Sequence, residues 1–67
     1  MKVYSLLGFV DYEGSDLLGV FGSLEDLMKY VEMKGDSLGY RHVGSSLGYV
    51  MSELGQEIDV YGDVEYL

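Results

Sequence analysis

The chain has 67 residues and a formal net charge of −8, from 12 acidic and 4 basic residues. This length allows one domain, residues 1–67, and so negative a chain is unsuited to direct binding of nucleic acid or anionic membranes. There is no cysteine, which excludes disulfides and thiolate metal sites, but a hydrophobic fraction of 48% is enough for a folded core. The first residues lack the long apolar stretch of a signal peptide, so we expect a cytoplasmic protein.

The first part of the chain predicts a β-hairpin. Residues 2–11 are apolar on both alternating faces, which is typical of a central strand. Residues 12–16 contain Gly14, Ser15 and Asp16, which favour a turn, and residues 17–21 can form the returning strand. The three carboxylates within residues 11–16 also resemble a calcium-binding loop. The flanking strands and the missing closing glutamate favour an ordinary hairpin turn instead.

A helix is predicted from Ser23 to Gly35. Ser23 is a suitable N-cap, and Asp26 stands where a capping box usually has Glu or Gln. Gly35 is expected to end the helix in the left-handed conformation. Four apolar residues have the spacing of one buried stripe, namely Leu24, Leu27, Met28 and Val31.

Two other helix residues, Tyr30 and Met33, are expected to lie off this stripe. An exposed Met–Tyr pair suits a docking surface, because both residue types are common at protein interfaces. Single exposed apolar residues are also ordinary on protein surfaces, and both interpretations stand.

The second half of the chain predicts more strands. We expect strands at residues 40–43, 47–54, 57–61 and 64–67, with turns at Gly55–Gln56 and Gly62–Asp63. The predicted fold is α+β, a small and mostly antiparallel sheet (ββαββ or ββαβββ) with one helix packed on one face.

Five acids in the last fifteen residues form the candidate partner-binding site, with no base among them. On a strand, Glu57 and Asp59 would lie on one face, about 6.5–7 Å apart. Such a row can imitate nucleic-acid phosphates, whereas the alternative is a charged sheet edge that prevents aggregation. The full predicted set comprises Glu53, Glu57, Asp59, Asp63 and Glu65, with Tyr61 and Tyr66 as flat contacts.

No motif in the sequence indicates catalysis, a cofactor or a metal. His42 is the only histidine, and no nucleophile or orienting acid is placed beside it in a recognisable pattern. A surface or packing role is the better interpretation of His42. The sequence therefore predicts a binding protein and not an enzyme.

A resemblance extends over the first half of the chain. Val3-Tyr4, residues 11–15, residues 18–21 and the helix capped by Ser23 resemble the opening of small uncharacterised bacterial and phage α+β domains. The resemblance implies a phage or mobile-element origin and supplies no catalytic residues. By analogy with small acidic phage proteins, the resemblance also implies an inhibitor of a host or defence protein, similar to an anti-CRISPR protein.

The sequence leaves two candidate functions. The first is an inhibitor that binds the basic surface of a host or defence protein, by steric blocking or by DNA mimicry. The second is a structural module that self-associates through a sheet edge or the helix face.

Overall fold

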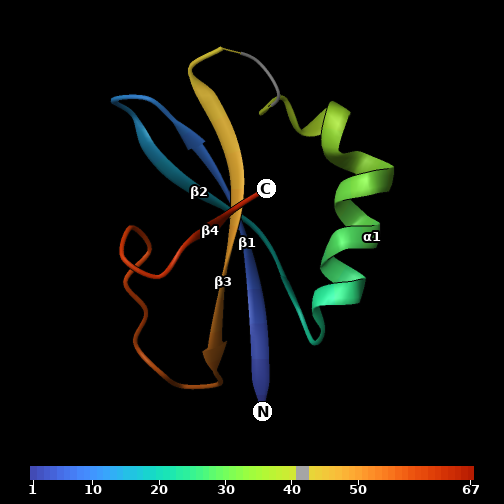
Figure 1. The fold of residues 1–67 in the computed structure, drawn as a ribbon, viewed down its shortest axis with the longest axis vertical. Helices are drawn as coiled ribbons and strands as arrows, with labels where there is room; N and C mark the ends of the chain where they lie inside the picture. Colours follow the sequence, from blue (N-terminus) through green and yellow to red (C-terminus); the bar gives the residue numbers. More distant parts are fainter. Residues whose placement is uncertain (41–42) are drawn as a thin grey trace.

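Antiparallel strands form the centre of the fold. The computed structural model describes residues 1–40 and 43–67. Its strands are β1 (Lys2–Val10), β2 (Gly14–Phe21), β3 (Ser45–Glu53) and β4 (Glu65–Tyr66), in the spatial order β2-β1-β3-β4. The helix α1 (Leu24–Lys34) and the short 3₁₀ helix η1 (Gly35–Leu38) lie between β2 and β3 in sequence. The fold is α+β, as the sequence predicts, with α1 on one side of the sheet and the chain between β3 and β4 on the other (Figure 1).

The predicted hairpin is confirmed. β1 pairs with β2 from Tyr4–Phe21 to Val10–Gly14, so β2 begins three residues earlier than the sequence predicts. The register shifts next to Leu6, which leaves Leu18 as an extra residue on β2, a β-bulge. On its other side β1 pairs with β3 along its full length, which makes β1 a central strand.

One face of the sheet packs against the helix. Leu6 and Leu47 from the sheet form a buried cluster with Leu27 and Val31 from α1. The stripe is therefore correctly predicted at Leu27 and Val31, but Met28 is 44% exposed and lies at its edge. The cap is also as predicted, because the Ser23 hydroxyl accepts a hydrogen bond from the backbone N–H of Asp26 at 3.1 Å.

The α-helix ends at Lys34 with Gly35 as its C-cap, as the sequence predicts, but the predicted left-handed conformation of Gly35 is wrong. Gly35 has φ −55° and ψ −40°, so it continues the right-handed helix, and its N–H donates to the carbonyl of Val31. The Ser37 hydroxyl then donates to the carbonyl of Lys34 at 2.9 Å and supports the turn of η1. The left-handed residue is Gly39, with φ 81°. This extension brings Leu38 onto the helix-side core.

The opposite face of the sheet is covered by residues 54–64, which we call the C-terminal segment. Its Val60 and Val64 pack on the buried cluster of Leu7, Phe9 and Val50. The turn predicted at Gly55–Gln56 is present, and the Gln56 N–H donates to the carbonyl of Glu53 at 2.9 Å. The strand predicted at residues 57–61 is wrong, because this stretch is irregular up to a turn that begins at residue 60.

Hydrogen bonds of one side chain explain why no strand forms there. The Asp59 carboxylate accepts the N–H groups of Tyr61 at 3.1 Å and Gly62 at 3.0 Å. The Asp63 N–H donates to the Asp59 carbonyl at 2.8 Å, and the Asp63 carboxylate accepts the Asp59 N–H at 3.2 Å. An aspartate that bonds to nearby backbone in this way offers an alternative to strand pairing.

The remaining predictions have mixed outcomes. The edge strand predicted at residues 64–67 is present as β4, whose Glu65 and Tyr66 pair with β3. Residues 41 and 42, in the middle of the strand predicted at residues 40–43, lie outside the described residues. The prediction for His42 is therefore not tested either. Tyr40 lies outside any strand, and Val43 belongs to a turn.

Candidate functional site

Three aromatic rings gather on the sheet face that the C-terminal segment covers. Phe9 points from β1 into this face and is buried. Its ring centroid lies 6.1 Å from that of Tyr61, in the C-terminal segment, and 5.4 Å from that of Tyr66, in β4. Tyr61 and Tyr66 remain 65% and 60% exposed, so each ring contacts Phe9 and still faces solvent. The structure thus brings together the two tyrosines that the sequence predicts as contact residues.

These rings line a shallow pocket at the hairpin end of the sheet. The pocket has a volume of about 280 Å³. Tyr61 spans it, because its hydroxyl lies 3.7 Å from the place that a Cβ at Gly14 would occupy. Besides the three rings, the lining includes Asp11, Tyr12, Gly14 and Ser46.

Tyr12 has an unusual backbone conformation. It is the third residue of a turn that the Glu13 N–H closes on the carbonyl of Val10 at 3.0 Å, and its φ is 66°. Glycine or asparagine is usual at a turn position with positive φ, and other residues are strained there. The Tyr12 side chain is fully exposed, so no packing within the fold accounts for a tyrosine at this position.

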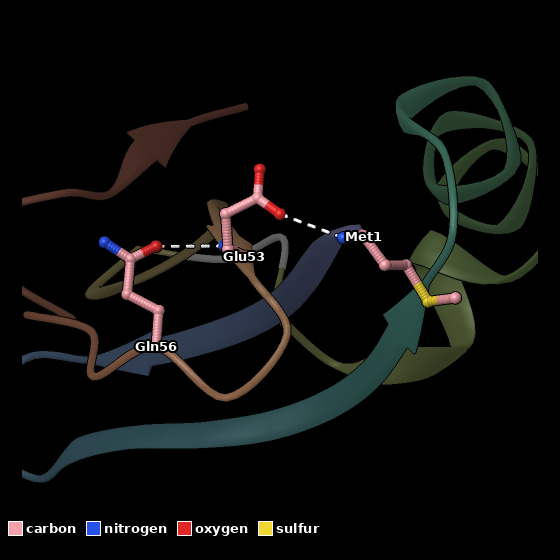
Figure 2. A network of polar contacts seen from close by, with 3 residues as sticks. All are labelled: Met1, Glu53 and Gln56. Carbon is pink, nitrogen blue, oxygen red and sulfur yellow. Dashed lines mark hydrogen bonds and ion pairs between the residues drawn. The ribbon is translucent and has the colours of Figure 1, made fainter.

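The predicted acids do not form one group. Glu53 lies at the far end of β3 from Ser46, about 24 Å away along the strand. Its carboxylate pairs with the Met1 ammonium at 3.0 Å, and its N–H donates to the side-chain oxygen of Gln56 at 2.9 Å (Figure 2). Glu53 therefore joins the start of β1 to the end of β3.

The regular row of carboxylates that the sequence predicts is also absent. Asp59 and Asp63 use their carboxylates to hold the C-terminal segment together. Glu57 and Glu65 are exposed, and the residues that the structure describes offer neither carboxylate a hydrogen bond or an ion pair. Glu65 pairs with Tyr49 and Tyr66 with Gly48, so the strand alternation places Glu65 on the opposite face from Tyr66.

The predicted docking pair on the helix is separated. Met33 is 80% exposed, as expected. Tyr30 is only partly exposed and packs on the helix-side core, where its ring centroid lies 5.3 Å from that of Phe21. The prediction of an exposed Tyr30 is wrong, because the aromatic ring of Phe21 at the end of β2 extends the apolar surface that α1 meets.

A second pocket, of about 400 Å³, opens on the other side of β3 and is lined by Tyr40, Ser45, Ser46, Leu47 and Leu67. The Tyr40 hydroxyl donates to the Asp16 carboxylate at 2.7 Å. This hydrogen bond, together with partial desolvation and the negative charge of Asp16, raises the pKa of Tyr40 above its ordinary value of 10.0. Tyr40 is thus engaged within the fold at neutral pH.

The lining of the aromatic pocket combines aromatic rings with one acidic residue. Aromatic faces attract ammonium and guanidinium groups, and Asp11 adds a negative charge to the lining. Within residues 1–40 and 43–67, no three histidine, cysteine or acidic side chains are grouped so that they could hold a metal ion. None of the described helices is long and apolar enough to cross a membrane.

Of the lining residues, the sequence predicts only Tyr61 and Tyr66 as contacts and misses the others, among them Phe9, Asp11 and Tyr12. The sequence predicts Phe9 and Asp11 only as residues of the first strand, and Tyr12 only as part of the turn at residues 12–16. A tyrosine between two acids in a tight turn, Asp11-Tyr12-Glu13, was the available signal.

Comparisons with known proteins provide no relative for this chain. No protein family, no curated protein and no solved structure matches it. The resemblance to small bacterial and phage domains therefore stays a prediction.

Proposed function

We propose that this protein binds the basic surface of a host or defence protein and inhibits it by steric blocking, as a small phage-type inhibitor acting in the bacterial cytoplasm. The observation that carries the proposal is the uncompensated negative charge of the folded chain. Attraction between opposite charges over this surface would speed association and align the two partners.

Few of the acids are neutralised inside the fold. The described residues contain two ion pairs, Glu25 with Lys29 at 3.2 Å and Glu53 with the Met1 ammonium at 3.0 Å. The net charge of −8 is therefore carried mainly by acids without a basic neighbour among those residues. Such a surface repels nucleic acid and favours a basic protein.

The two faces of the molecule differ in charge, which supports docking through the face opposite the helix. α1 carries Lys29 and Lys34 beside its acids. The C-terminal segment carries three acids and no base. Together with β4 it supplies the exposed rings of Tyr61 and Tyr66, the type of side chain enriched at protein interfaces. Steric blocking is preferred to DNA mimicry because the evenly spaced row of carboxylates is not formed.

The test is capture from bacterial lysate with immobilised protein. We expect a dominant partner with a basic surface, released as the salt concentration rises from about 0.05 to 0.5 M, because salt screens exposed charges. The partner's own activity should fall when the protein is added. A partner that stays bound at high salt, or whose activity is unchanged, would contradict the proposal.

Two charge-matched double variants locate the docking face. Glu13→Gln with Glu57→Gln removes two charges near the pocket and in the C-terminal segment, and should weaken capture. Glu25→Gln with Glu32→Gln removes the same number from α1 and should leave capture close to wild type. Equal losses would show that only the total charge matters.

Self-association is the second candidate, because β2 is an edge strand of the sheet. Its Leu17 and Val20 are exposed, and unpaired edges can join a second chain. The bulge at Leu18 opposes this by twisting the edge. Sedimentation velocity over a range of concentrations separates the two functions, since self-association requires a sedimentation coefficient that rises with concentration.

A further inference from the structure

We propose that the aromatic pocket binds one arginine side chain, which the basic partner supplies. That the arginine comes from a basic partner protein rests on the proposed function, whereas the preference of the pocket for arginine does not. The pocket would be the anchor point of the docking face. Its ligand is a guanidinium group held between aromatic rings and next to a carboxylate.

The geometry of the rings supports a flat cationic ligand. Phe9 forms the floor, with Tyr61 and Tyr66 inclined against it at interplanar angles of 56° each. Ser46, paired with Phe9 across the two strands, presents only a small side chain, which leaves space beside the rings. The exposed faces of Tyr61 and Tyr66 are therefore available for stacking.

The charge around the pocket determines the sign of the ligand. Asp11 lines the pocket and Glu13 is exposed in the same turn, whereas the lining residues that the structure describes include no lysine or arginine. An anion would be repelled here, and a neutral aromatic ligand would leave Asp11 without a counter-charge.

Tyr12 provides an independent observation. Its strained backbone, with φ 66°, and its fully exposed ring place an aromatic side chain at the mouth of the pocket without any contribution to the core. Strain of this kind tends to occur at functional positions. From the hairpin turn, the Tyr12 ring can close over a bound ligand.

Arginine fits this arrangement better than lysine does. A guanidinium group is planar, stacks on aromatic faces and can donate two hydrogen bonds to one carboxylate, whereas a lysine ammonium is compact and strongly hydrated. The pocket offers several rings and Asp11 as its lining carboxylate, which matches the planar group.

The test is an NMR titration of the ¹⁵N-labelled protein with N-acetyl-arginine amide. We expect saturable shifts at the amides of Gly14, Ser46 and Tyr66. The neutral isostere N-acetyl-citrulline amide should bind at least several-fold more weakly, and N-acetyl-lysine amide should lie between the two. Absence of shifts at these amides, or equal binding of arginine and citrulline, would overturn the proposal; equal binding of lysine would overturn the preference for a guanidinium.

Two variants test the pocket without removing core residues. Asp11→Asn keeps the shape of the side chain and should weaken arginine binding about five-fold, because a neighbouring carboxylate is lost. Tyr12→Gly fits the positive φ and should weaken binding about two- to five-fold, the effect of one exposed cation–π contact. Met33→Ala, on α1, is the control and should leave the affinity unchanged. Unchanged affinity in both pocket variants would contradict the assignment.

The failure of this proposal and the failure of the proposed function are distinguishable. If lysate capture is salt-sensitive but arginine amide does not shift the pocket, the inhibitor function stands and the arginine site is wrong. If arginine amide binds with the expected selectivity but no basic partner is captured, the site stands and the proposed function is wrong.

Discussion

At the scale of single residues, the contact between Gly8 and Tyr40 fixes the chain that returns from the helix. A Cβ at Gly8 would lie 2.5 Å from two atoms of the Tyr40 ring, so the ring rests directly on the backbone of β1. The Tyr40 hydroxyl also donates to the Asp16 carboxylate, which lies across from Gly8 on β2. The ring cannot move away from Gly8 without disturbing this hydrogen bond.

Gly8→Ala should therefore destabilise the fold. The added methyl group forces the Tyr40 ring to move, and overpacking of this kind costs about 1–3 kcal/mol. Urea unfolding followed by circular dichroism measures the free energy of unfolding. The control is Gly22→Ala, because a Cβ at Gly22 meets no atom within 4 Å. Equal stability of the two variants would show that the Tyr40 contact does not restrain β1.

At the scale of elements, the C-terminal segment covers the sheet face opposite α1, the role that a helix on the second face has in three-layer α/β folds. It covers Leu7 and Val50 with only two apolar side chains, Val60 and Val64. Val64 can approach closely because the neighbouring sheet position is Gly48, where a Cβ would lie 2.7 Å from a Val64 methyl carbon. Because so few apolar side chains cover this face, the position of the C-terminal segment depends on the local hydrogen bonds that fix its path.

Asp59→Ala should loosen the C-terminal segment. It removes the two hydrogen bonds that the N–H groups of Tyr61 and Gly62 donate to the Asp59 carboxylate, with a cost of about 1–2 kcal/mol. Hydrogen exchange at the Tyr61 and Gly62 amides should become faster. Glu57→Ala, an exposed acid two residues away, should leave both exchange rates near wild type. If the two variants behave alike, the turn does not depend on Asp59.

The elements that the sequence predicts well are those with local signals. The hairpin follows from alternation and turn residues, and the start of α1 follows from Ser23 and Asp26, whose hydrogen bond the structure contains. Residues 57–61 also alternate, but alternation does not reveal that Asp59 bonds to its own backbone neighbours. The end of α1 is predicted correctly, but the left-handed conformation of Gly35 is not, because glycine permits both a right-handed and a left-handed backbone.

The candidate site could be predicted only in part. Composition and position predict Tyr61 and Tyr66 as contact residues, and both rings contact Phe9 in the structure. The positions of Asp11 and Tyr12 beside them depend on which hairpin end meets the C-terminal segment. Such long-range placement is set by packing across the sheet, which a local pattern does not report.

At the scale of the whole molecule, the sheet separates two unlike surfaces (Figure 1). The helix side carries Lys29 and Lys34 among its acids, whereas the C-terminal segment carries three acids and no base and lies beside the exposed rings of Tyr61 and Tyr66. The aromatic pocket lies on this second side. A basic partner would therefore meet the sheet face that the C-terminal segment covers, and not α1.

The most direct test is to map the docking face by NMR. The amide shifts of the ¹⁵N-labelled protein would be recorded with and without the basic partner captured from lysate. The expected result is that the perturbed amides cluster at Gly14, Ser46 and residues 57–66, with α1 unchanged. Perturbations centred on α1 around Met33 would contradict docking through the acidic face.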